Sequence, residues 1–113
     1  MHENRTSPRK RVHEKIQVVD LNSGEVMGNL VNISTGGLML LSEVPLAPNR
    51  LFQLSLVLPS QLDGAASIEF GVECLWVQDA EESNAPCWAG FQIIDISEQS
   101  SQLIAQLMAA WTE

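Results

Sequence analysis

Apolar and polar residues alternate through residues 68–76, which read Ile-Glu-Phe-Gly-Val-Glu-Cys-Leu-Trp. Every even position from Ile68 to Trp76 is apolar, and the odd positions are polar or small until Leu75. Since successive side chains of a β-strand point to opposite faces, this period of two predicts a strand with one face in a core and the other in water. The even positions of residues 52–58 are also all apolar, so a second such strand is expected there. These two segments predict a mostly β fold.

Short apolar runs separated by turn residues predict the rest of the organisation. We expect six strands, at residues 15–21, 25–33, 37–42, 51–58, 67–77 and 88–94. A helix is expected at 97–111, with Ser97 as its N-cap and an apolar stripe at the i, i+3, i+4 spacing. The stripe consists of Leu103, Ile104, Leu107, Met108 and Trp111. Six short strands and one helix predict a small antiparallel barrel or sandwich, in which the helix covers an open end or forms an interface.

Charge is distributed unevenly along the chain, which has 113 residues and is expected to form a single domain over residues 1–113. Residues 1–15 carry five basic and two acidic side chains, net +3, and residues 16–113 carry one basic and twelve acidic, net −11. Residues 1–11 are predicted to be a flexible basic arm in front of a β-barrel at residues 15–94. Such an arm is expected either to meet an anionic partner or to dock on the acidic body.

Composition argues against several classes of protein. Hydrophobic residues make up 45% of the chain and charged residues 18%, and no apolar run approaches the roughly 20 residues that span a bilayer. With only two cysteines and no signal peptide pattern, a reducing cytoplasm is the expected location, and Cys74 is expected to be a buried, inert thiol. The two histidines have no partners at metal-ligand or catalytic spacing, so neither a metal site nor enzymatic activity is expected.

Two arginines on the arm, Arg5 and Arg9, are the first candidates for a binding site. Guanidinium groups bond bidentately to phosphate oxygens or to O6 and N7 of guanine, and they also stack on bases. The spacing of the two arginines is a weak signal by itself, because such pairs are common.

Residues 32–37, Asn-Ile-Ser-Thr-Gly-Gly, are the second candidate. If the strand continues through this segment, Asn32 and Ser34 project to one face, where their donors and acceptors suit the edge of a base. Gly36 and Gly37 allow positive φ or the close approach of a ligand. The alternative is that the asparagine and serine form a local turn before a glycine bend.

The order of these features along the chain resembles the PilZ domain family, whose signatures are Arg-x-x-x-Arg and (Asp/Asn)-x-Ser-x-x-Gly. The first signature corresponds to Arg5 and Arg9, and the second to Asn32, Ser34 and Gly37. A Gly-Phe pair in the last expected strand and the terminal helix complete the resemblance, which covers nearly the whole chain.

The resemblance implies a six-stranded antiparallel β-barrel with a C-terminal α-helix that binds cyclic di-GMP, a bacterial second messenger with two guanines and two phosphates. It implies that Arg5 and Arg9 supply most of the affinity, that Asn32 and Ser34 orient a guanine, and that Gly37 makes room for it. The expected additional contacts are Lys10, Arg11 and Gly36.

The implied function is that of a cyclic di-GMP receptor or adaptor that changes conformation and regulates an unidentified effector protein, with an output such as motility, pili, biofilm or exopolysaccharide. One alternative is a PilZ-like adaptor that binds protein and no nucleotide. A second is a small nucleic-acid-binding barrel. The acidic body argues against the second alternative, as does the expectation that the surface lacks aromatic platforms.

Overall fold

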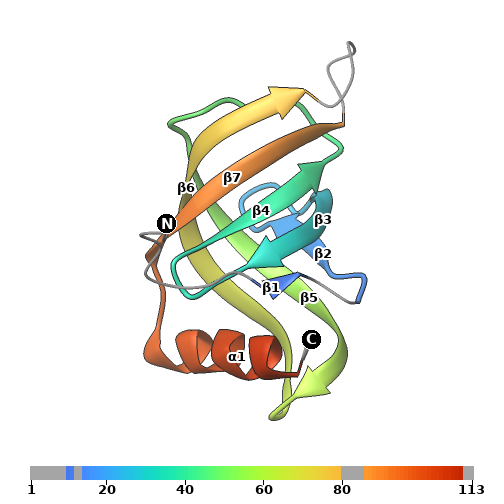
Figure 1. Cartoon of the computed structure of the whole chain (residues 1–113), viewed down its shortest axis with the longest axis vertical. Helices are drawn as coiled ribbons and strands as arrows, with labels where there is room; N and C mark the ends of the chain where they lie inside the picture. The colour runs from blue at the N-terminus through green and yellow to red at the C-terminus, as the bar shows by residue number, and fades with distance from the viewer. Residues whose placement is uncertain (1–9, 12–13, 80–85, 111–113) are drawn as a thin grey trace, which may run out of the picture.

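A computed structural model describes residues 10–11, 14–79 and 86–110 of the chain. Seven strands and one helix follow one another in the sequence (Figure 1). They are β1 (Lys10–Arg11), β2 (Gln17–Asp20), β3 (Val26–Ile33), β4 (Gly37–Ser42), β5 (Leu51–Leu62), β6 (Ala65–Asp79), β7 (Cys87–Asp95) and α1 (Glu98–Ala109).

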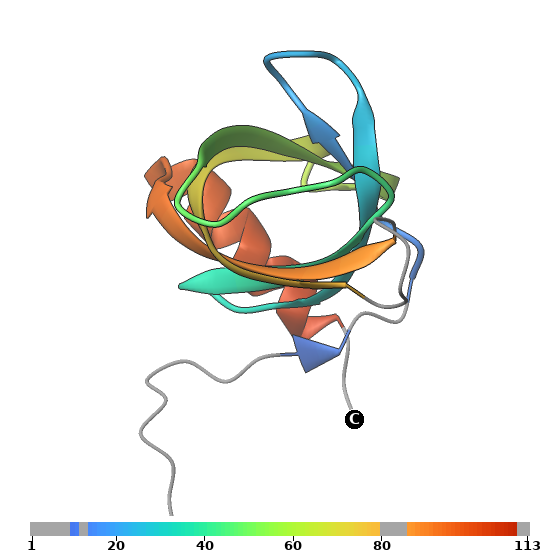
Figure 2. The ribbon, with the colours of Figure 1, turned by 90° about the horizontal axis from the view of Figure 1, so that it is seen from above.

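Strands β2 to β7 close into a barrel in which every pairing is antiparallel. The order around the barrel is β3-β2-β5-β6-β7-β4, and the pairing of β4 with β3 closes the circle (Figure 2). Closure leaves no free edge among these six strands. The predicted six-stranded antiparallel barrel with a C-terminal helix is therefore confirmed, in place of the sandwich.

Strand β1 is a short seventh strand that pairs with the last residues of β3, beyond the part of β3 that pairs with β2. Lys10 pairs with Ile33 and Arg11 with Asn32 on β3, whereas β2 pairs with the earlier part of β3, from Val26 to Asn29. Strands β1 and β2 therefore lie one after the other along the same side of β3. The last two residues of the segment predicted as an arm are thus paired with the barrel, and residues 1–9 lie outside the described residues.

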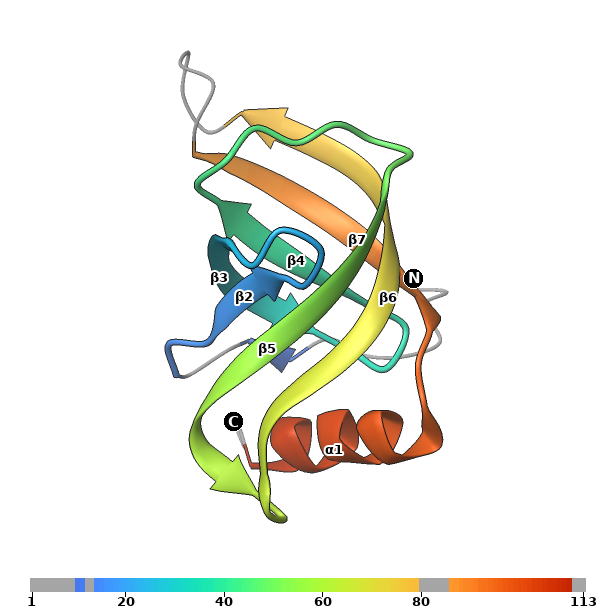
Figure 3. The same ribbon diagram turned by 180° about the vertical axis from the view of Figure 1, so that it is seen from behind.

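The hairpin formed by β5 and β6 is longer than predicted. Its strands meet at Asp63 and Gly64, whose φ values of 55° and 84° are those of a tight two-residue hairpin turn. The added residues 59–61 are exposed, so they carry no apolar alternation from which a strand could have been predicted. This end of the hairpin extends beyond the barrel next to α1 (Figure 3).

Helix α1 lies across one end of the barrel and packs on β5 and β6 (Figure 3). Leu103, Ile104 and Leu107 join the core, and Met108 packs against it. The Ser97 hydroxyl accepts a hydrogen bond from the Ser100 N–H at 3.0 Å, which confirms the predicted N-cap. The predicted stripe residue Trp111 lies outside the described residues. In the described part of the chain, no helix has the length and hydropathy needed to cross a membrane.

The alternation in β6 changes phase at a β-bulge, and this overturns one prediction. Cys74 pairs with Phe91 and Trp76 pairs with Gly90, so Leu75 is an extra residue between two successive pairs. Cys74 is fully buried, whereas Trp76 is 41% exposed. The prediction that Trp76 lies on the core face is therefore wrong, because the bulge turns it to the outside.

Both cysteines are buried and free, as predicted for Cys74. Burial raises the pKa of the Cys74 thiol above its ordinary value, and the neighbouring Cys87 raises it further. A hydrogen-bonding interaction with the backbone of Trp76 lowers the pKa and is outweighed by burial. The Cys74 thiol also donates a hydrogen bond to the Trp76 carbonyl, with 3.7 Å between sulfur and oxygen, and this bond favours the protonated form. A thiol held neutral in this way is expected to react slowly.

Candidate nucleotide-binding site

The turn between β3 and β4 is organised by the hydroxyl group of Ser34. Its Oγ accepts hydrogen bonds from the N–H groups of Gly36 and Gly37, both at 3.2 Å, and donates one to the Gly37 carbonyl at 3.4 Å. The backbone N–H of Ser34 also donates to that carbonyl, at 2.8 Å. Ser34 is only 2% exposed, because β3 ends at Ile33 and the turn folds its side chain over the backbone. These bonds match the turn-forming alternative.

The two glycines connect this turn to the last strand. Gly37 pairs with Gln92 on β7, and the Gly36 carbonyl accepts a hydrogen bond from the Ile93 N–H at 3.0 Å. Positive φ is not what requires glycine here, because the described glycines with positive φ are Gly24 and Gly64. The second predicted role of Gly36 and Gly37, which is to let a ligand approach the backbone closely, stays a prediction.

Asn32 lies on the outer face of β3. Its neighbour Ile33 is fully buried, and Asn32 is half-buried with its Nδ2 directed at Met39 Sδ, 3.7 Å away. Met39 is the partner of Asn32 on β4. The sequence predicted the outward position of Asn32 but not its thioether neighbour, since only the pairing register reveals that residue.

Strand β1 carries the basic segment to this place. Arg11 is the cross-strand partner of Asn32, and Lys10 is the partner of Ile33. The chain that leads back to Arg9 and Arg5 therefore begins beside the polar turn, although these residues are 20 to 30 positions apart in the sequence. The side chains of Lys10 and Arg11, and all of Arg5 and Arg9, lie outside what the structure describes.

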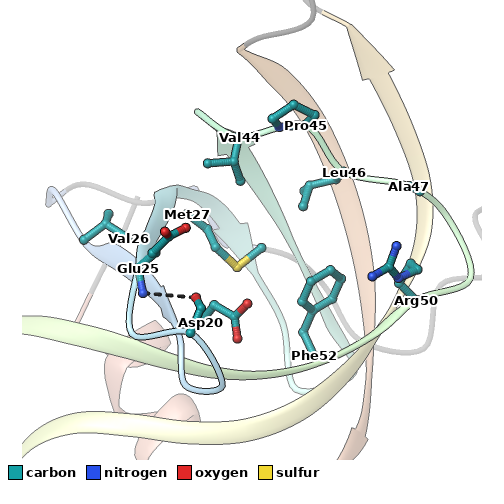
Figure 4. Close-up of a pocket in the computed structure, with 11 residues that line it drawn as sticks. Asp20, Glu25, Val26, Met27, Val44, Pro45, Leu46, Ala47, Arg50 and Phe52 are labelled. Atoms are coloured by element: carbon teal, nitrogen blue, oxygen red, sulfur yellow. Dashed lines mark hydrogen bonds between the residues drawn. The ribbon is translucent and has the colours of Figure 1, made fainter.

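A separate pocket lies at the end of the barrel opposite the helix (Figure 4). It has a volume of about 250 Å³ and lies between the β2–β3 turn and the β4–β5 connection. Its walls combine apolar side chains with charged ones, namely Met27, Val44, Leu46, Phe52, Asp20, Glu25 and Arg50. None of the predicted site residues lines this pocket, so the candidate site is the face around Asn32.

Within the described residues, no three His, Cys, Asp or Glu side chains lie close enough together to hold a metal ion.

The sequence model of the PilZ domain matches residues 3–110. Since this match spans nearly the whole chain, the protein belongs to the PilZ domain family, as the two signatures predicted. PilZ domains are typically non-enzymatic receptors or adaptors, and no catalytic family is indicated. A search of curated protein sequences finds no match.

Solved structures share this fold at low sequence identity. The PilZ domain of YcgR from Escherichia coli, solved with c-di-GMP, superposes with a TM-score of 0.72 at 14% identity, covering 96% of this chain and 92% of that chain. MotI/DgrA, the inhibitor of motility of Bacillus subtilis, has a TM-score of 0.72 at 15% identity, covering 96% of this chain and 51% of its own. The MrkH–c-di-GMP complex of K. pneumonia gives 0.68 at 19% identity, with coverages of 96% and 52%. The chain thus spans about half the length of MotI/DgrA and MrkH.

Proposed function

We propose that this protein is a cytoplasmic receptor for cyclic di-GMP, which binds at the outer face of β3 between the polar turn and the basic arm. The observation that carries the proposal is the pairing of β1 with β3, because it places Lys10 and Arg11, the last two residues of the arm, beside Ile33 and Asn32. Arg9 directly precedes Lys10, and covalent geometry keeps consecutive Cα atoms about 3.8 Å apart. The YcgR and MrkH structures solved with c-di-GMP support the choice of ligand.

Electrostatics require that the arm supply the cations for an anionic ligand. Residues 12–113, beyond the arm, carry two basic and thirteen acidic side chains, net −11. Of the two basic residues, Arg50 lines the pocket at the far end of the barrel, and Lys15 lies beside Gly28 and Asn29, at the earlier part of β3. Arg5 and Arg9 bind the phosphates and the guanine edges bidentately, and Lys10 and Arg11 add positive charge.

The residues of the turn have complementary roles in this proposal. Asn32 bonds to a guanine edge, for which its amide offers both donors and an acceptor. Ser34 acts mainly through the shape of the turn that its hydroxyl holds, and Gly36 and Gly37 leave space for the ligand above the backbone.

Signalling follows from the connection between the turn and the helix. The Gly36 carbonyl accepts a hydrogen bond from Ile93 and Gly37 is the cross-strand partner of Gln92 on β7, and β7 ends three residues before α1 begins. A ligand that bridges the arm and the turn shifts the position of β7 and α1 or orders the arm, and an effector protein binds one of the two states.

Calorimetric titration with cyclic di-GMP, with GMP as the control ligand, tests the proposal. The variants Arg5→Ala and Arg9→Ala are each expected to bind at least about tenfold more weakly, or about 1.4 kcal/mol. Arg50→Ala is the matched control, since it removes the same side chain from the far end of the barrel, and it is expected to keep wild-type affinity. Wild-type affinity in both arm variants contradicts the role of the arm. No binding by the wild type contradicts the proposed function and leaves the nucleotide-free adaptor.

A further inference from the structure

A row of cross-strand neighbours runs around the outside of the barrel from the proposed site. Asn32 on β3 is paired with Met39 on β4, Met39 with Gly90 on β7, and Gly90 with Trp76 on β6. The residues that flank this row on β4 and β7 are all in the core, and they are Leu38, Leu40, Ala89 and Phe91. Because side chains alternate along a strand, the row itself faces outward.

The indole of Trp76 lies over the backbone of Gly90. A Cβ atom at position 90 would overlap Nε1 and Cε2 of the indole and would lie 2.8 Å from Cζ2. The ring therefore extends from β6 across β7, in the direction of Met39. Gly90 is covered in this way, while 41% of the Trp76 side chain stays exposed.

The bulge at Leu75 produces this arrangement. Without the extra residue, the alternation of β6 would place Trp76 inside the barrel with Cys74. Bulges that redirect a side chain are enriched next to functional sites. From the sequence, we expected a surface without aromatic platforms and used this expectation against the nucleic-acid alternative. The exposed indole of Trp76 shows that this expectation was wrong.

Distance and charge both suit a base at this place. Adjacent strands are about 4.8 Å apart, so Gly90, two strands from Asn32, is roughly 10 Å away from it. The second base of a cyclic dinucleotide can reach that far, since both bases are attached to one small ring of sugars and phosphates. No member of the row is charged, although the body of the protein is strongly acidic.

We propose that Trp76, seated on Gly90, is a stacking platform for one purine base of the ligand, while Asn32 and the arm bind the rest of the molecule. This inference rests on the proposed function and adds a subsite to it. Stacking is tolerant of base identity because every base has a π-face, so the platform contributes affinity and Asn32 contributes selectivity. A protein partner is the less favoured occupant, because the row is continuous with Asn32.

Four variants test the platform by calorimetric titration with cyclic di-GMP. Trp76→Ala is expected to weaken binding roughly fivefold to a hundredfold, the range for loss of one base–aromatic stack. Trp76→Phe keeps an aromatic ring and is expected to recover most of the affinity. Gly90→Ala is expected to weaken binding by displacing the indole, and to have no further effect when combined with Trp76→Ala, because the ring it displaces is then absent. Val57→Ala is the matched control, since Val57 is 40% exposed on β5, away from the row.

Tryptophan fluorescence gives an independent readout. The wild type is expected to lose fluorescence on binding, and the Trp76→Phe variant is expected to keep its fluorescence although it binds. If Trp76→Ala lowers the melting temperature but binds as the wild type does, Trp76 only covers Gly90 and the platform is refuted. Retained quenching in Trp76→Phe refutes it as well. If the wild type binds, Arg9→Ala binds weakly and Trp76→Ala binds normally, then the platform is refuted and the proposed function stands. If the wild type does not bind cyclic di-GMP, both proposals are overturned.

Discussion

The hydroxyl of Ser34 makes a prediction that can be worked out from its hydrogen bonds. In Ser34→Ala, the N–H groups of Gly36 and Gly37 lose their acceptor. Gly36 is exposed, so water can replace the bond, but Gly37 is buried. A buried donor left without a partner costs about 1–3 kcal/mol. The Gly37 carbonyl keeps its 2.8 Å bond from the Ser34 N–H, so it adds no comparable loss.

We therefore expect Ser34→Ala to lower the free energy of unfolding by about 1–3 kcal/mol, with an unchanged dependence on urea. For a domain of this size, each kcal/mol corresponds to a fall in Tm of roughly 4 °C. Urea denaturation followed by circular dichroism measures the change, and Ser60→Ala, at an exposed position of β5, is the matched control. A loss below about 0.5 kcal/mol, the usual size of a surface effect, would refute the conclusion that this hydroxyl holds the turn.

Three further predictions concern the barrel and its helix. Gly28→Ala is expected to destabilise the protein by at least about 1–3 kcal/mol, since a Cβ there would overlap the Leu41 carbonyl; wild-type urea denaturation would contradict this close approach. Ser97→Ala is expected to lose about 1 kcal/mol through the bond to the Ser100 N–H, and the same assay with no change would show that the cap is not stabilising. Because burial raises the pKa of Cys74 in the folded state, the unfolded chain loses this proton first. The contribution of Cys74 to the free energy of unfolding is therefore intact below the ordinary thiol pKa, about 8.5, and this contribution declines as the pH rises above that value. Urea denaturation at about pH 7 and about pH 10, with Cys74→Ser as control, checks this, and equal pH dependence of the two proteins would contradict it.

The fold could be predicted because its main signals are local. Alternation of apolar residues in β5 and β6, glycine-containing turns, and the i, i+3, i+4 stripe of α1 each depend on neighbours in the sequence. The turn between β5 and β6 has a local signal of the same kind, since Asp-Gly is a dipeptide typical of two-residue hairpin turns and both Asp63 and Gly64 have positive φ. Closure of the barrel depends on the pairing of β4 with β3, and the family resemblance supplied that part of the prediction.

The parts that the sequence did not reveal depend on register. The bulge that turns Trp76 outward is visible only in its pairing with Gly90, although Leu75 had already interrupted the alternation at that point. Strand β1 has two residues, too few for any periodicity, so its pairing with Asn32 could not be predicted. The hydrogen bonds of Ser34 needed the turn geometry, because either orientation was compatible with the sequence.

Amide chemical-shift mapping with cyclic di-GMP tests most directly where the ligand binds. The account predicts saturable shifts concentrated in the amides of residues 32–37 and around Gly90, with little change at Met27, Val44 and Phe52 in the separate pocket. Shifts concentrated in that pocket, or no shifts at saturating ligand, would contradict the central claim that the outer face of β3 is the nucleotide-binding site.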